Sequence, residues 1–128
     1  MKRSISAAVF ILILSVAAAA QGGNAGPRRI ELVNGRNSIT LTGILSNSQE
    51  MEFVFHARKG RVVSLKMSSS NLFDFRLFNA ESDFDTEFDS SSSATHELPA
   101  DGDYYLFVRK KMVGRPRTAR FKLFLAIK

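Results

Sequence analysis

Apolar residues recur at every second position through most of the chain. The clearest run is the C-terminal one, made of Ala119, Phe121, Leu123, Leu125 and Ile127. A period of two places alternate side chains on opposite faces, so it predicts strands with one buried face. The same alternation predicts strands at residues 30–32, 39–45, 51–57, 62–67, 72–78 and 104–108. No segment shows a sustained period of 3.6, and we therefore expect an all-β protein.

Turn residues separate these strands. Residues 99–103 (Pro-Ala-Asp-Gly-Asp) lie between an arm at 94–98 and an arm at 104–108, and proline followed by Asp-Gly reverses a chain without strain. This pattern predicts a hairpin, and Lys59-Gly60 predicts a second one between residues 51–57 and 62–67. The stretch from Asn79 to Thr95 lacks any pattern and is predicted as a long loop. Together these signals favour an antiparallel β-sandwich of about seven or eight strands over a small barrel.

The first 20 residues have the composition of a signal peptide. Lys2 and Arg3 precede an apolar run from Ile5 to Val16, and four alanines follow it. The run is shorter than the roughly 20 residues that a membrane span needs. We therefore predict a signal peptide at 1–20, a disordered lead at 21–28 and one domain at 29–128. An exported chain without cysteine favours a bacterial periplasmic or secreted protein, with no membrane attachment in its mature form.

Charge is distributed unevenly along the chain. The formal net charge is +6, and removing residues 1–20 leaves 16 basic and 12 acidic residues, or +4. Residues 81–103 contain eight acids and no Lys or Arg, whereas residues 109–128 contain eight bases and no acid. The two segments either neutralise each other as solvated loops or present the basic one to an anionic partner. Nucleic acid is not expected as that partner, because the protein is exported.

Few residues suggest catalysis or metal binding. There is no cysteine, and His56 and His96 lie in no recognised catalytic or metal-binding motif, so we expect neither an enzyme nor a cofactor. Four acids alternate from residue 83 to residue 89, and a calcium-stabilised domain is one interpretation of them. Their spacing lacks the glycine and the final glutamate of an EF-hand, so we favour a solvated acidic segment.

The order of these features resembles a known family. Gly43-Ile44-Leu45, the strand at 52–55, the segment at 57–63 and Leu98 to Val108 occur together as in bacterial pre-peptidase C-terminal domains. As a separate exported chain, the protein is similar to the periplasmic inhibitors of g-type lysozyme, over about residues 39–128. The resemblance implies a pre-peptidase-like β-sandwich that occludes the cleft of a lysozyme. The alternative is an accessory module that binds a polysaccharide or a cell-envelope partner, with an aromatic platform formed by Phe78, Tyr105, Phe107 and Phe124.

Two segments are the candidate contacts with a partner. The first is the turn Asp101, Gly102, Asp103 and Tyr104, in which Asp101 occupies the position where the inhibitors commonly have serine. Tyr104 has two interpretations: a core ring whose hydroxyl bonds the backbone, which we favour, or a contact residue. The second segment is the basic loop with Arg115, Arg117 and Arg120, and such cations could pair with the catalytic carboxylates of a muramidase.

Overall fold

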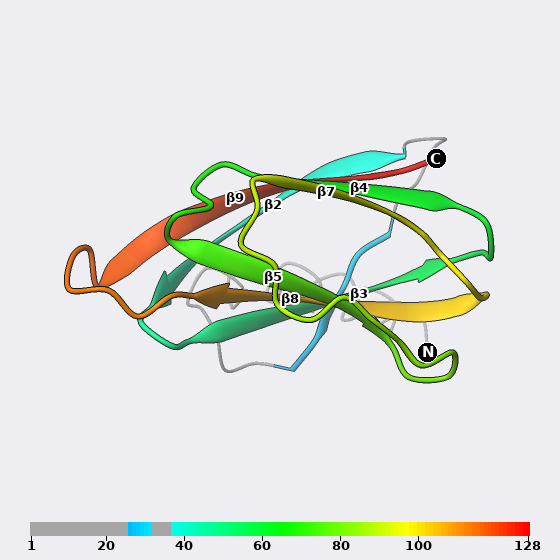
Figure 1. Cartoon of the computed structure of the whole chain (residues 1–128), viewed down its shortest axis with the longest axis horizontal. Coiled ribbons are helices and arrows are strands. Elements are labelled where there is room, and N and C mark those ends of the chain that lie inside the picture. The colour runs from blue at the N-terminus through cyan, green and yellow to red at the C-terminus, as the bar shows by residue number, and fades with distance from the viewer. Residues whose placement is uncertain (1–25, 32–36) are drawn as a thin grey trace, which may run out of the picture.

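The computed structural model describes residues 26–31 and 37–128, and these residues form two packed β-sheets without a helix (Figure 1). The predicted signal peptide lies outside the described residues, as does the predicted lead up to residue 25. Arg28, which the sequence placed at the end of that lead, belongs to the first strand. The strands are β1 (Arg28–Arg29), β2 (Ser38–Ser46), β3 (Glu50–Ala57), β4 (Val62–Met67), β5 (Phe73–Asn79), β6 (Phe84–Asp85), β7 (Ser93–Glu97), β8 (Gly102–Lys110) and β9 (Thr118–Ile127).

One sheet has the order β1-β3-β8-β5-β6, and the other has the order β2-β9-β4-β7. Among the described strands, every pairing is antiparallel except that of β1 with β3. The inner faces carry the alternating apolar residues, and the rings of Phe53 and Phe73 pack edge-on against Phe121 between the sheets. Gly43 permits this packing, because a Cβ there would lie 2.7 Å from Met51 and Phe121 side-chain atoms. The predicted all-β sandwich is confirmed.

Both predicted hairpins are wrong. β7 pairs with β4 rather than with β8, and β3 pairs with β8 rather than with β4. Each turn carries the chain from one sheet to the other, and a tight turn has the same residue preferences in either setting. The segment predicted as a loop from residue 79 to 95 contains β6 and the start of β7.

The strand directions divide the connections between two ends of the sandwich. The loop end holds the β2–β3 turn (residues 47–49) and the β8–β9 loop (residues 111–117). The turn end holds the β3–β4 turn (residues 58–61), the β7–β8 turn (residues 98–101) and the last residue, Lys128. β8 runs from the turn end to the loop end, and its nine residues span about 30 Å. Within the part of the chain that the structure describes, no helix is long and apolar enough to cross a membrane.

Candidate binding loop at one end of the sandwich

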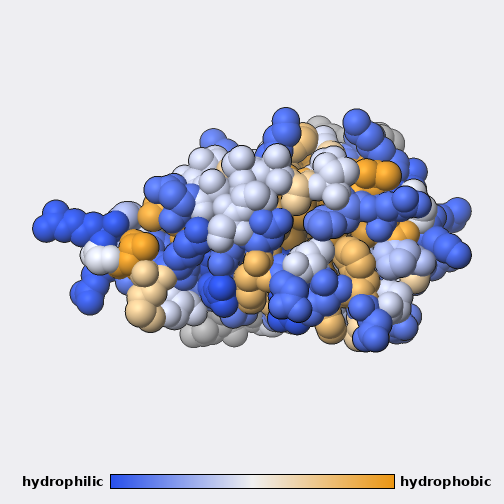
Figure 2. Space-filling model, viewed as in Figure 1, coloured by the Kyte–Doolittle hydropathy of each residue, from blue (hydrophilic) through white to orange (hydrophobic). Residues whose placement is uncertain are grey.

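The β8–β9 loop extends beyond both sheets at the loop end, where it forms the orange projection in Figure 1. Met112 is 75% exposed, and Arg115 and Arg117 are exposed as well. Hydrophilic side chains extend from this end of the surface beside a small apolar patch (Figure 2). An exposed methionine between cations combines apolar contact area with positive charge, and this combination suits a protein partner.

The base of the loop is fixed by Asn47 in the β2–β3 turn. Its side-chain amide donates to the Val113 carbonyl at 2.8 Å, and its backbone N–H donates to the Arg117 carbonyl at 2.9 Å. Its Oδ1 accepts the Val113 N–H at 3.4 Å. One residue therefore contacts both arms of the loop, and the tip between them is presented in a defined position. Such preorganisation lowers the entropy cost of binding.

Lys110 supports Asn47 from inside the core. Its side chain is 0% exposed, and its ammonium donates to Asn47 Oδ1 at 2.8 Å and to the Lys111 carbonyl at 3.0 Å. Among the described residues no acid forms an ion pair with it. A buried ammonium requires hydrogen-bond acceptors, so the charge of Lys110 holds the two loops together. The contact between Asn47 and Lys110 was not predicted from the sequence.

The arginines of the predicted basic loop are available to a partner. Arg115, Arg117 and Arg120 are exposed and form no ion pair with any described residue. Arg120 lies two residues into β9, opposite Ile44 of β2. None of the four ion pairs in residues 26–31 and 37–128 joins the acidic segment 81–103 to the basic segment 109–128. The basic segment therefore keeps a positive field at the loop end.

The other predicted contact, the turn from Asp101 to Tyr104, serves the fold. Tyr104 is 0% exposed and stacks on Phe55, and its hydroxyl donates to the Ala100 carbonyl at 2.6 Å. The core interpretation of Tyr104 is confirmed, and a buried ring cannot contact a partner. Asp101 is exposed but accepts the Lys59 N–H at 2.7 Å, which ties the two turns together. Gly102 has a φ of +144°, which explains the glycine there.

Asp103 completes this turn. Arg29 donates to its carboxylate at 2.8 Å, and His56 Nδ1 lies 3.4 Å from it. Among the described residues, no serine, threonine or tyrosine hydroxyl forms a hydrogen bond with His56. His56 and Asp103 are therefore not part of a nucleophile–base arrangement there. The two predicted contact segments are at opposite ends of β8, about 30 Å apart. The structure does not bring them into one site.

Two ion pairs should make the stability of the fold depend on pH. The hydrogen bond from Arg76 lowers the pKa of Asp85, and the hydrogen bond from Arg29 lowers the pKa of Asp103, both from an ordinary 3.8. A carboxyl group whose pKa is lower in the folded state than in the unfolded state stabilises the protein at pH values above its unfolded-state pKa. This contribution is lost as the pH falls through the folded-state pKa. We expect urea unfolding of the double variant Asp85→Asn, Asp103→Asn to show lower stability at pH 7 and a shallower loss below about pH 4. An unchanged acid slope would contradict this assignment.

The predicted aromatic platform is divided between the two sheets. Phe78, Tyr105 and Phe107 lie on the outer face of one sheet, whereas Phe124 lies on the other, in β9. The guanidinium of Arg76 is 5.4 Å from the Phe78 ring centroid and 5.7 Å from that of Phe107. The four rings therefore do not form one surface for a polysaccharide.

Two of the four alternating acids of residues 83–89 accept local hydrogen bonds. Asp85 accepts hydrogen bonds from Arg76 at 2.8 Å and from the Glu87 N–H, and Asp89 accepts from the Ser91 hydroxyl and N–H. Across the described ranges, no three His, Asp or Glu side chains gather where they could hold a metal ion.

Comparisons with known proteins identify the fold. No family model and no curated protein matches the sequence. The structure of PliG from Aeromonas hydrophila, a periplasmic inhibitor of g-type lysozyme, matches with a TM-score of 0.67 and 18% identity over 80% of this chain and 96% of that chain. PliG from Salmonella Typhimurium matches with a TM-score of 0.66 and 24% identity over 82% and 100%. The pre-peptidase C-terminal domain of Bacillus anthracis collagenase matches with a TM-score of 0.52 and 20% identity over 83% and 100%. The resemblance to the periplasmic lysozyme inhibitors and to pre-peptidase C-terminal domains is thus confirmed as a shared β-sandwich fold.

Proposed function

We propose that the protein is an exported, non-enzymatic binding protein of the periplasm or the secreted fraction that inhibits a lysozyme of the g type. The proposal rests on one observation: the β8–β9 loop projects from the sandwich and carries Met112, Arg115 and Arg117 on a base fixed by Asn47. The similar PliG structures, which are inhibitors of g-type lysozyme, support the choice of partner.

The loop has the chemistry that an acidic cleft requires. Glycoside hydrolases carry a pair of carboxyl groups beside the scissile bond, and a guanidinium forms short, charge-assisted hydrogen bonds with a carboxylate. Arg115 and Arg117 have no competing ion pair among the described residues, so binding would not first have to break one. Arg120 on β9 adds positive charge behind the tip and would speed the encounter with an acidic partner.

Titration of lysozyme activity tests the proposal. The mature protein is added to g-type, c-type and i-type lysozymes, and we expect loss of activity with the g-type enzyme at micromolar inhibitor or below. We also expect the inhibition to weaken as salt is raised, because exposed charges are screened over about 10 Å at 0.1 M ionic strength. Full activity of all three enzymes at micromolar protein would overturn the proposal.

A further inference from the structure

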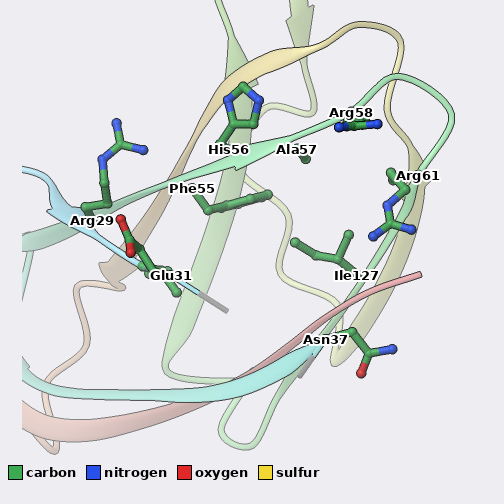
Figure 3. A pocket seen from close by; sticks show the side chains of 10 residues that line it. Arg29, Glu31, Asn37, Phe55, His56, Ala57, Arg58, Arg61 and Ile127 are labelled. Carbon is green, nitrogen blue, oxygen red and sulfur yellow. The ribbon is translucent and has the colours of Figure 1, made fainter. Parts of the chain in front are cut away.

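A pocket of about 410 Å³ lies at the turn end of the sandwich, at the far end of β8 from the binding loop (Figure 3). Its inner surface includes Phe55, Ala57 and Ile127, which are at most 6% exposed. A volume of this size falls within the range of small-molecule sites, about 300–1,000 Å³. The apolar floor suits a small aliphatic or aromatic group.

One wall of the pocket carries two unpaired cations. Arg58 and Arg61 come from the β3–β4 turn, and Figure 3 shows them on the same side of the pocket. Both are exposed, and neither forms an ion pair with any residue in the described ranges. A guanidinium presents paired N–H donors that a carboxylate accepts, so this wall suits a carboxylate.

The turn that bears these arginines is held by its neighbours. The Gly60 N–H donates to the Leu98 carbonyl at 2.8 Å, and the Leu98 N–H donates to the Arg61 carbonyl at 2.8 Å. The Lys59 N–H donates to Asp101 Oδ1 at 2.7 Å. The backbone beneath both guanidinium groups is therefore fixed before a ligand arrives, which lowers the entropy cost of binding.

The opposite wall carries an acid beside a cation that is already paired. Figure 3 shows Arg29 and Glu31 on the side away from Arg58 and Arg61. Asp103, 2.8 Å away, neutralises the charge of Arg29. The hydrogen bond to Asp103 is the largest cause of the raised pKa of Arg29, and the negative charge of Glu31 raises it further. With Asp103 balancing Arg29, Glu31 leaves this wall with one net negative charge.

We propose that this pocket binds a small zwitterion: a short peptide with a free amino end, a free carboxylate and an apolar side chain. The carboxylate would pair with Arg58 and Arg61, and the ammonium would lie beside Glu31. The side chain would cover the floor formed by Phe55 and Ile127. This site shares no residue with the β8–β9 loop, so the inference does not rest on the proposed function.

Blocked peptides test the proposal directly. The ¹⁵N-labelled mature protein is titrated with the dipeptide Ala-Leu, with N-acetyl-Ala-Leu and with Ala-Leu amide, and amide shifts are followed by NMR. We expect shifts centred on residues 55–61 with the free dipeptide, and about tenfold weaker binding for each blocked form, which is the effect of losing roughly 1.4 kcal/mol. No shifts at 20 mM dipeptide, a concentration that would nearly saturate a site with a Kd of about 1 mM, would overturn the proposal. Equal binding of either blocked peptide would overturn it as well.

Variants assign the two walls separately. We expect Arg58→Gln, Arg61→Gln to bind the free dipeptide no better than wild type binds the amide, and Glu31→Gln to remove the preference over the acetylated peptide. The matched control is Lys66→Ala, Lys122→Ala, which changes two exposed cations on the outer face of the second sheet. Wild-type affinity in the arginine variant, or a loss of affinity in the control, would contradict the assignment.

Discussion

Replacing Arg115 and Arg117 with alanine is expected to weaken inhibition of g-type lysozyme by about a hundredfold or more. Truncating one partner of a buried, hydrogen-bonded charge pair at an interface costs roughly 2–5 kcal/mol, and 1.4 kcal/mol corresponds to tenfold. Both side chains are exposed and unpaired in the described structure, so their removal should leave the free energy of unfolding nearly unchanged. The measurement is the inhibitor concentration at half-maximal lysozyme activity, with a urea unfolding curve for each variant.

The control for this variant removes the same amount of charge elsewhere. Lys66→Ala, Lys122→Ala also lowers the net charge by two, but both lysines are on the outer face of the sheet formed by β2, β9, β4 and β7. We expect it to change inhibition by only a few fold, through weaker electrostatic steering. An equal loss in both variants would mean that overall charge, rather than the loop tip, produces the inhibition. Unchanged inhibition in the arginine variant would remove the β8–β9 loop from the proposed interface.

Period-two patterning predicted which residues form the core strands, because alternation follows directly from the geometry of a half-buried strand. It could not predict which strands pair. The turn at 98–101 has the residues of a hairpin turn, yet β7 and β8 lie in different sheets. Local turn chemistry reverses the chain, whereas the choice between one sheet and two depends on contacts between residues far apart in sequence. The same limit explains the wrong prediction for the Lys59-Gly60 turn.

The candidate site was predictable in part. The basic loop and its arginines could be found from charge alone, but Asn47 lies in the polar segment Ser46-Asn47-Ser48, where its sequence neighbours do not distinguish it from an ordinary turn residue. The sequence does carry a signal for Lys110: it continues the period-two run of Tyr104, Leu106 and Val108, and the structure buries all four side chains. Because basic residues flank Lys110 on both sides, the sequence favoured a solvated position for its side chain. The partner of the buried ammonium lies 63 residues away, and no local pattern indicates such a contact.

The contact between Asn47 and Lys110 yields the other large expected effect. Asn47→Leu removes an acceptor from the buried ammonium and both side-chain hydrogen bonds to Val113. Hydrogen bonds to charged groups contribute about 1.5–3 kcal/mol, so we expect a loss of at least that size in the free energy of unfolding, measured with urea. We also expect weaker inhibition and faster amide exchange in residues 111–117, because the base of the loop is no longer fixed.

A double variant separates the two consequences. Adding Lys110→Met to Asn47→Leu removes the buried charge along with its acceptor, and replacing both partners with apolar groups is often neutral or stabilising. We therefore expect Asn47→Leu, Lys110→Met to regain most of the lost stability while inhibition stays weak, since the hydrogen bonds to Val113 are still absent. A double variant as unstable as Asn47→Leu would show that the ammonium is not what requires Asn47. Full inhibition by the stable double variant would show that the partner itself orders the loop, and that preorganisation by Asn47 is not needed for binding.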